Sequence, residues 1–196
     1  RGGSQHDFPS HLKNFEDRTQ QRLGSAEDIA ATRTILPFFL PARSNNEAKA
    51  ALDALISTPV GLLKYGLGIL TSRFRAHHPL KACPACLEAD IMEHGTSYWR
   101  LTHQLPGVWV CPRHMTMLHE ATLKSSGVLR FGWLLPHAGT LQSVTIKPSN
   151  ATSIDALTRF ARLASHWSDL APATVSVNAL GDVYRSALRL SGRGKH

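Results

Sequence analysis

Cysteine is scarce in this sequence, with three residues among 196. A disulfide-stapled secreted domain would carry more cysteines, in an even number, and a secretory leader. The chain opens Arg-Gly-Gly-Ser-Gln-His-Asp, without a methionine or an apolar leader, and we expect its ends to be cut or poorly ordered ends of a longer polypeptide. The longest apolar stretch, residues 59–70, contains Lys64 and three glycines and is shorter than the roughly eighteen residues of a membrane span. We therefore expect a cytoplasmic protein without a membrane partner.

Acidic side chains are also few, at 14 against 22 Lys and Arg, which gives a formal net charge of +8. The excess is uneven: residues 1–80 carry +3, residues 81–120 carry −1 and residues 121–196 carry +6. A basic surface is typical of proteins that bind nucleic acid or another polyanion, although it can also serve solubility alone. The middle segment is not basic, so we expect it to be a scaffold or a protein contact, with the phosphate-binding charge elsewhere.

The three cysteines lie within 29 residues, in a Cys-Pro-Ala-Cys motif at 83–86 and a Cys-Pro-Arg-His motif at 111–114. Three thiolates and an imidazole suit Zn²⁺ in a closed tetrahedral site. Ligands three residues apart suit a tight turn, and proline helps to fix such a turn. A closed site stabilises a fold, so the pattern favours recognition over catalysis. The predicted ligands of one structural zinc ion per chain are Cys83, Cys86, Cys111 and His114.

Several alternatives to this site stay open from the sequence. Two cysteines could form a disulfide, or all three could be buried as small apolar side chains. An enzyme could use the metal to activate water, with Glu88 or Glu93 as the base, although three thiolates make a poor hydrolytic centre. The fourth ligand could also be one of three other nearby histidines, His94, His103 and His119.

Local signals predict a mostly α-helical fold with a small zinc-ribbon-like α+β module at residues 81–120. Residues 87–94 are expected to form a helix that ends at Gly95. Residues 97–100 and 108–110 are expected to form two strands. Aromatic side chains are expected to form the core of this module rather than to stack on bases. These aromatic residues are Tyr98, Trp99 and Trp109.

The region before the module, residues 1–80, is predicted to be helical. Ser25 and Asp28 form a capping box at the start of one helix. The apolar stretch 35–41 has a proline near each end, so we expect it to pack as an extended linker. The alanine-rich stretch 45–56 predicts a further helix.

Beyond the module, residues 121–151 are predicted to be an irregular linker and residues 152–196 a helical C-terminal region. Two amphipathic helices there are compatible with a helix-turn-helix and equally with an ordinary helical hairpin. The face of the last helix that is expected to turn inward carries Leu180, Val183, Tyr184, Ala187 and Leu188. The candidate nucleic-acid contacts are basic residues on the outer faces of these helices and just before the first cysteine motif: Arg73, Arg75, Arg159, Arg162, Arg185 and Arg189.

A longer pattern connects the two cysteine motifs. Tyr98-Trp99 lies between them, and His103-Gln104-Leu-Pro-Gly precedes the second motif. Over about forty residues, this pattern resembles the TniQ family, which includes the TnsD-type target selectors of transposons. Residues 8–12 and 34–41 also look like the helical region before the zinc module of such members.

The resemblance implies a non-enzymatic, zinc-containing protein that directs transposon insertion from the bacterial cytoplasm, at the nucleoid. The cysteine-motif ligands would hold the zinc, and Trp99, His103 and Gln104 would support them, with the imidazole bonded to a backbone carbonyl. Implied partners are double-stranded target DNA, an AAA+ ATPase regulator with its transposase, and for some relatives a guide-RNA complex. The alternative function is a protein adaptor that docks on a guide-RNA effector complex and the ATPase regulator with little direct DNA contact.

Overall fold

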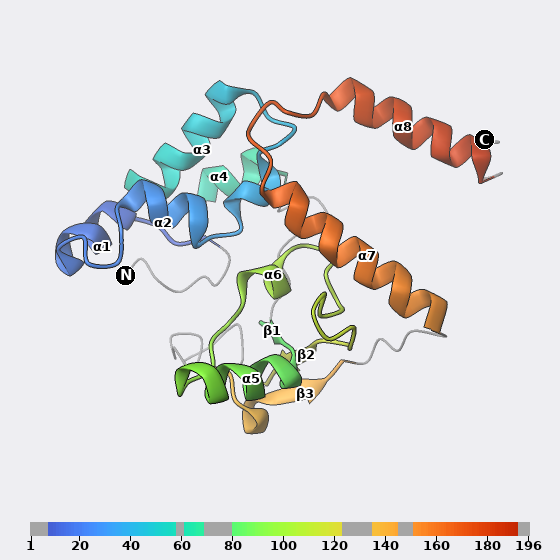
Figure 1. Ribbon diagram of the computed structural model, residues 1–196. Coiled ribbons are helices and arrows are strands. Elements are labelled where there is room, and N and C mark those ends of the chain that lie inside the picture. Colours follow the sequence, from blue (N-terminus) through green and yellow to red (C-terminus); the bar gives the residue numbers. More distant parts are fainter. Residues whose placement is uncertain (1–7, 58–60, 69–79, 123–134, 145–150, 192–196) are drawn as a thin grey trace.

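The computed structural model describes residues 8–57, 61–68, 80–122, 135–144 and 151–191. Eight α-helices and one three-stranded sheet in these ranges confirm the predicted mostly α fold with a small α+β module. Figure 1 shows the N-terminal helices grouped on one side and the sheet with α5 on the other, with α7 running between the two groups.

The elements follow the chain in three stretches. The first contains α1 (Leu12–Thr19), α2 (Ala26–Thr32), the 3-10 helix η1 (Leu36–Phe39), α3 (Asn45–Ser57) and α4 (Gly61–Gly66). The second contains β1 (Lys81–Ala82), α5 (Pro84–His94), α6 (Leu101–Gln104) and β2 (His119–Ala121). The third contains the 3-10 helix η3 (Ala138–Thr140), β3 (Leu141–Ser143), α7 (Ala151–Ser168) and α8 (Val177–Leu190).

The N-terminal helices pack around a small apolar core. Helices α1, α2 and α3 contact one another, and the buried alanines of α2 and α3 let the backbones approach closely. The predicted Ser25 N-cap is confirmed, because the Asp28 backbone N–H donates to the Ser25 hydroxyl at 3.1 Å; in place of the reciprocal bond of a capping box, that hydroxyl donates to the Asp28 carboxylate at 2.8 Å. The core includes Phe8, Leu12, Ala26, Ala30, Leu36 and Leu55.

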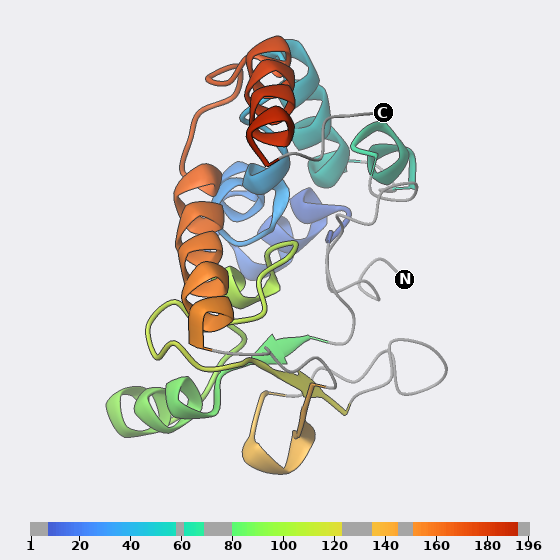
Figure 2. The same cartoon turned by 90° about the vertical axis from the view of Figure 1, so that its right-hand side faces the viewer.

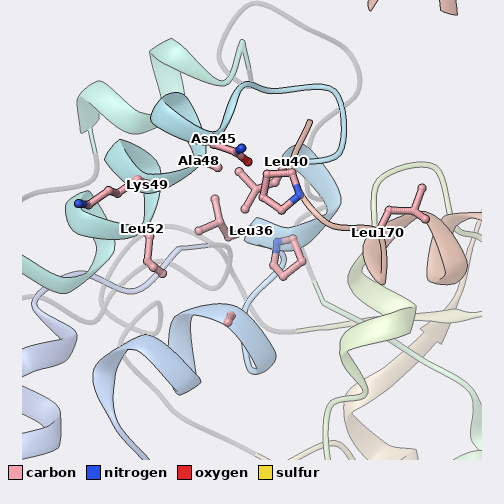
Figure 3. A pocket seen from close by; sticks show the side chains of 10 residues that line it. Leu36, Leu40, Asn45, Ala48, Lys49, Leu52 and Leu170 are labelled. Atoms are coloured by element: carbon pink, nitrogen blue, oxygen red, sulfur yellow. The ribbon is translucent and has the colours of Figure 1, made fainter. Parts of the chain in front are cut away.

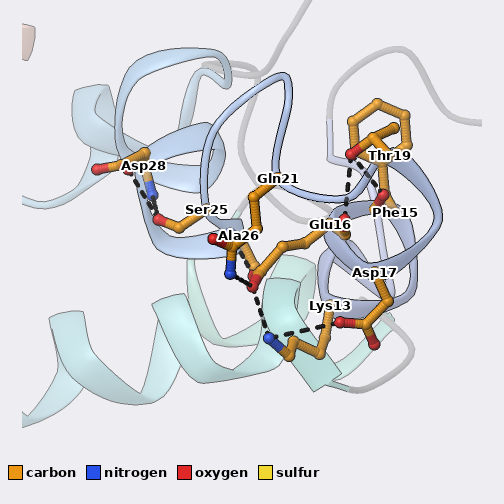
Figure 4. A network of polar contacts seen from close by, with 9 residues as sticks. All are labelled: Lys13, Phe15, Glu16, Asp17, Thr19, Gln21, Ser25, Ala26 and Asp28. Carbon is orange, nitrogen blue, oxygen red and sulfur yellow. Dashed lines mark hydrogen bonds and ion pairs between the residues drawn. The ribbon is translucent and has the colours of Figure 1, made fainter.

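A buried carboxylate joins α1 to α2 (Figure 4). Glu16 is 3% exposed and accepts hydrogen bonds from Lys13 Nζ at 2.6 Å, Gln21 Nε2 at 2.8 Å and the Ala26 backbone N–H at 2.8 Å. The Ala26 N–H belongs to the first turn of α2, where a helix has no donor–acceptor pairing of its own. The Lys13 bond, followed by the Ala26 and Gln21 bonds, lowers the pKa of Glu16 to about 2.

The stretch 35–41 is not the extended linker that its prolines suggested. Its central residues form η1, in which the Phe38 N–H donates to Ile35 O and the Leu40 N–H donates to Pro37 O, each at 3.2 Å. A 3-10 turn tolerates Pro37 because a residue in its first turn needs no N–H partner. The turn buries Leu36 and Phe38 in the core and leaves the carbonyl of Phe38 for another element.

Helix α7 bonds to that carbonyl and lies across the molecule. Trp167 Nε1 donates to Phe38 O at 2.8 Å, and α7 packs against η1 and α6. Ala161 and Ala164 are 2% and 3% exposed on the inner face of α7. Helix α7 therefore joins the N-terminal helices to the module that carries the cysteines (Figure 2).

Helix α8 is exposed, unlike α7, and the prediction that its apolar face turns inward is wrong. None of its residues is buried, and Val183 and Tyr184 are 67% and 66% exposed. The connection to α7 is fixed elsewhere, since the Ala173 N–H donates to Arg43 O at 2.8 Å and the Val175 N–H to Pro41 O at 3.0 Å. These bonds hold α8 away from α7, so the two apolar faces do not meet as they would in a helix-turn-helix (Figure 1).

The same connection borders an apolar hollow of about 400 Å³ on the N-terminal helices (Figure 3). Asn45 and Lys49 bring polar groups to its wall. The apolar part of the wall includes Leu36, Leu40, Ala48, Leu52, Leu170 and Pro172.

Candidate metal centre

The sheet brings the two cysteine motifs together. Its strand order is β1-β2-β3, antiparallel throughout, with Lys81 opposite Glu120 and Ala82 opposite His119. Strand β1 leads directly into the first motif, and β2 follows the second. The two motifs therefore become neighbours through pairing between strands that are far apart in the sequence.

The strands predicted inside the module are wrong. Residues 97–100 have no regular structure, and Val110 forms an isolated bridge with Met117 rather than a strand. The predicted aromatic core is also wrong, because Tyr98 is 38% exposed and Trp99 and Trp109 are half-buried. Aliphatic side chains fill the interior instead: Leu87, Leu105, Val108, Val110 and Leu118.

The first motif is the beginning of a helix. Cys83 is the residue before α5, in an extended conformation, and Pro84 takes the first helical position, where a missing N–H costs nothing. Cys86 follows in the first turn. The predicted end of this helix at Gly95 is confirmed, with φ 73°, while its start lies three residues before the predicted one.

The second motif is a compact turn between two antiparallel segments. The Met115 N–H donates to Cys111 O at 2.8 Å, and the Cys111 N–H donates to Thr116 O at 2.8 Å. The bridge between Val110 and Met117 closes the base of this turn. The turn thus points Cys111 and His114 toward the start of α5.

Four ligand atoms meet between the two motifs. The three Sγ atoms and one imidazole nitrogen of Cys83, Cys86, Cys111 and His114 all lie within 4.8 Å of one another. His114 Nδ1 is 3.5, 3.3 and 3.7 Å from the Sγ atoms of Cys83, Cys86 and Cys111, respectively. The Sγ atoms of Cys86 and Cys111 are 3.6 Å apart.

These separations fit a tetrahedral zinc site. Zn–S bonds near 2.3 Å and Zn–N bonds near 2.0 Å at tetrahedral angles would place two sulfurs about 3.8 Å apart and a sulfur and a nitrogen about 3.5 Å apart. The four distances given above are close to these values, and the cluster could hold a metal ion.

The charges of the three thiols depend on whether a cation is bound. A hydrogen bond from Cys111 lowers the pKa of Cys83 to about 3. The same bond, together with burial, raises the pKa of Cys111, and burial raises the pKa of Cys86. Three crowded sulfurs thus favour a single negative charge by themselves, and a divalent cation would supply the positive charge that favours three thiolates.

All three cysteines are buried, as one alternative expected, but a disulfide, a different histidine ligand and a glutamate in the cluster do not match this geometry. All three cysteines are free, and 3.6 Å is far longer than the roughly 2.05 Å of a disulfide. Among the described residues, the candidate metal-binding cluster contains His114 and does not contain His94, His103 or His119. Glu88 is exposed, and Glu93 forms an ion pair with His94 at 3.8 Å, so neither joins the cluster.

Sequence comparison places this cluster in a known family. The TniQ family matches residues 4–118, which is more than half of the chain and includes both cysteine motifs. The chain belongs to the TniQ family.

One relative of this TniQ chain is the transposon Tn7 transposition protein TnsD of Escherichia coli, with 23% identity over 108 residues. The matched part covers 55% of this chain and 21% of that relative. The matched part of the chain thus spans about a fifth of the length of the relative. Helices α7 and α8 lie beyond the residues that match the family.

The TniQ motif residue Gln104 holds the first cysteine motif in place. Its Oε1 accepts from the Lys81 backbone N–H at 3.0 Å, and its Nε2 donates to Lys81 O at 2.7 Å and to Arg100 O at 3.0 Å. The amide therefore pairs with β1 as a neighbouring strand would, two residues before Cys83. This contact supports the predicted structural role of Gln104.

His103 is buried at 2% exposure beside it, and burial lowers its pKa to about 4, which favours the neutral ring. We expected this imidazole to bond a backbone carbonyl, but its Nδ1 has no hydrogen-bond partner among the described residues. Trp99 is half-buried in the same segment. The supporting role of Trp99 and His103 stays a prediction.

Two charged residues near the cysteine motifs are buried, and their burial was not predicted from the sequence. Asp90 is fully buried on α5 and pairs with Arg100 in the segment that leads to α6. Lys81 is also fully buried, where its Nζ donates to Val108 O and lies 4.6 Å from the Trp109 ring centroid. Burial lowers the pKa of Lys81 to about 8, against the opposing effect of Glu120. Asp90 could have been noticed, because it lies three residues after Leu87 on the inner helical face.

The arginines predicted to contact nucleic acid lie in different parts of the structure. Arg159 and Arg162 are exposed on α7, and Arg162 Nη2 donates to Pro112 O at 3.4 Å. Arg185 and Arg189 are exposed on α8, where Arg185 pairs with Asp182 at 2.6 Å. Arg73 and Arg75 lie outside the described residues. No helix in the described ranges is long and apolar enough to cross a membrane.

Proposed function

We propose that this TniQ chain is the zinc-containing part of a transposon target selector, which recognises target DNA and recruits the transposition machinery. The observation that carries the proposal is that the family match, residues 4–118, contains the whole cluster of Cys83, Cys86, Cys111 and His114. A relative of the chain is a transposition protein. The proposed partners are double-stranded target DNA, an AAA+ ATPase regulator and the transposase.

The metal in this proposal is one structural zinc ion per chain. Three cysteines and one histidine fill the four positions of a tetrahedral site, so no coordination position remains for water or substrate. The zinc would hold the start of α5 against the turn at 111–114. The chain would then act by binding and not as an enzyme.

Elemental analysis tests the zinc directly. We expect one equivalent of zinc per chain in protein purified without chelator, and its loss on Cys111→Ser substitution. A well-ordered parent protein without a stoichiometric transition metal would contradict the proposal.

Direct DNA contact is supported by the charge of +6 in residues 121–196. Binding of the full chain to duplex DNA, measured by fluorescence anisotropy, should weaken steeply as salt rises, because the release of counterions from the DNA on binding is less favourable at higher salt. An affinity that does not change between low and moderate salt would contradict direct contact with phosphates.

A protein adaptor is the second candidate function, in which the chain docks on a guide-RNA effector complex and the ATPase regulator. It is favoured by the exposed apolar face of α8, which includes Leu180, Val183 and Tyr184. Combined charge reversal of Arg159, Arg162, Arg185 and Arg189 separates the two candidates. A target selector would lose DNA binding and recruitment together, whereas an adaptor would keep recruitment.

A further inference from the structure

The turn of the second cysteine motif carries one arginine that the proposed zinc site does not use. Arg113 lies between Pro112 and His114, and its side chain is exposed. Its position in the turn is set by the hydrogen bonds that close the turn at Cys111. The backbone of Arg113 is therefore fixed while its guanidinium faces solvent.

Helix α7 passes directly beside this turn. Arg162 Nη2 donates to Pro112 O at 3.4 Å, across 50 residues of sequence. Arg159 lies one turn earlier on the same exposed side of α7, because residues three apart are neighbours on a helix surface. The fold thus brings the turn that carries Arg113 next to α7, at the turn of the helix that carries Arg159 and Arg162.

These three arginines are available to an anion. No ion pair joins any of them to a carboxylate within the ranges that the structure describes, whereas Arg100 pairs with Asp90 and Arg185 with Asp182. A guanidinium has five N–H donors, so Arg162 keeps four after its bond to Pro112 O. That bond also restrains the Arg162 side chain, which lowers the entropy cost of a further contact.

We propose that Arg113, Arg159 and Arg162 form one phosphate-binding surface, the turn–α7 surface, for the backbone of duplex DNA. The inference rests on the proposed function, since DNA is its partner there. It adds Arg113, from the near-neutral segment 81–120, to the proposed DNA contacts. The zinc would then also contribute to DNA binding, because the zinc-bound turn would position Arg113. Guanidinium groups bind backbone phosphates, and such contacts fix position without reading sequence.

Fluorescence anisotropy of the full chain with a mixed-sequence DNA duplex, over a range of salt concentrations, tests this surface. In Arg113→Ala/Arg159→Ala/Arg162→Ala, the slope of log affinity against log salt should fall by about 3, or roughly 1 for each arginine. Each single variant should bind on the order of tenfold more weakly at about 0.1 M salt. The triple Arg→Lys variant should keep most of the salt slope, because a lysine also neutralises a phosphate.

The matched control is Arg18→Ala/Arg22→Ala/Arg33→Ala, which removes three exposed arginines at α1 and α2, away from the turn. It should keep the parent slope, and both triple variants should keep the parent melting temperature and metal content. Equal losses in the two triple variants would overturn the turn–α7 surface and leave DNA binding as a property of general charge. Parent-like binding of the first variant would overturn the surface alone, and no DNA binding by the parent would overturn both the surface and direct DNA contact in the proposed function.

Discussion

Helices α7 and α8 follow each other in the chain and carry the same kind of amphipathic pattern, yet their surroundings are opposite. Helix α7 buries Ala161 and Ala164 and bonds η1 through Trp167, while α8 buries none of its residues. An apolar stripe thus indicates that a helix has a face to cover, but it does not indicate what covers that face. Residue size does not distinguish the two, because Ala187 lies in the α8 stripe as Ala161 and Ala164 lie in the α7 stripe. What distinguishes α7 is its packing on η1 and α6 and the bond from Trp167 to Phe38 O.

Loss of the proposed zinc site should have the largest effect, and it should affect α7 but not α8, because the site lies beside α7. Cys111→Ser should unfold the central module, because structural zinc in small domains contributes on the order of 10 kcal/mol. Hydrogen exchange of the full chain should then show loss of protection in α5, α6 and α7, with α8 unchanged. A variant that melts like the parent and keeps its zinc would show that the predicted ligand set is wrong.

Overpacking of the α7 interface should have the next largest effect. Ala164→Leu inserts a larger side chain at a position that is 3% exposed, and we expect a loss of about 1–3 kcal/mol in the free energy of unfolding. The matched control is Ala187→Leu on the exposed surface of α8, which should change stability by less than about 0.5 kcal/mol. Urea unfolding measures both. Equal losses would mean that α8 is packed in solution.

A smaller, pH-dependent effect is expected on the N-terminal helices that support α7 through η1. The pKa of Glu16 is lowered from 4.5 in the free side chain to about 2, so its carboxylate stabilises the fold above about pH 4.5. That contribution is lost as the pH falls through about 2. Glu16→Gln should therefore reduce stability at neutral pH and flatten its decline under acid, as followed by circular dichroism. An unchanged acid profile would show that the Glu16 contacts do not contribute.

The smallest effect is expected from the apolar face of α8 itself. Leu180→Gln/Val183→Gln/Tyr184→Gln changes residues that are 40%, 67% and 66% exposed, so the melting temperature of the isolated chain should stay close to that of the parent. A fall of several degrees would indicate that this face is covered in solution, and gel filtration of both proteins would then show whether a second copy covers it.

Some features were predictable because their signals are local. The cysteine motifs contain all four ligands of the cluster, and their tight turns need only neighbouring residues. The Ser25 cap, the end of α5 at Gly95 and the alanine-rich α3 are likewise decided within a few residues. For such features, backbone hydrogen bonds and allowed dihedral angles already select one conformation.

Other features required partners far away in the chain. Predicted strands at 97–100 and 108–110 were wrong because 81–82 pairs instead with 119–121, which in turn pairs with 141–143. The pairing of the Gln104 amide with Lys81 could not be read from either residue alone. In the same way, the net charge of −1 for residues 81–120 hid the position of Arg113 beside α7.

The sequence by itself determined the set of candidate metal ligands, the helical character and the positive net charge of this TniQ protein, because each depends on residue type and short spacing. Only the tertiary structure decided that one face of α7 is buried while α8 has no buried residue, and that the turn carrying Arg113 lies beside α7. Burial and charge clustering depend on which surfaces meet, and that is set by the packing of the whole chain, because an apolar stripe or an arginine carries no information about its distant neighbour.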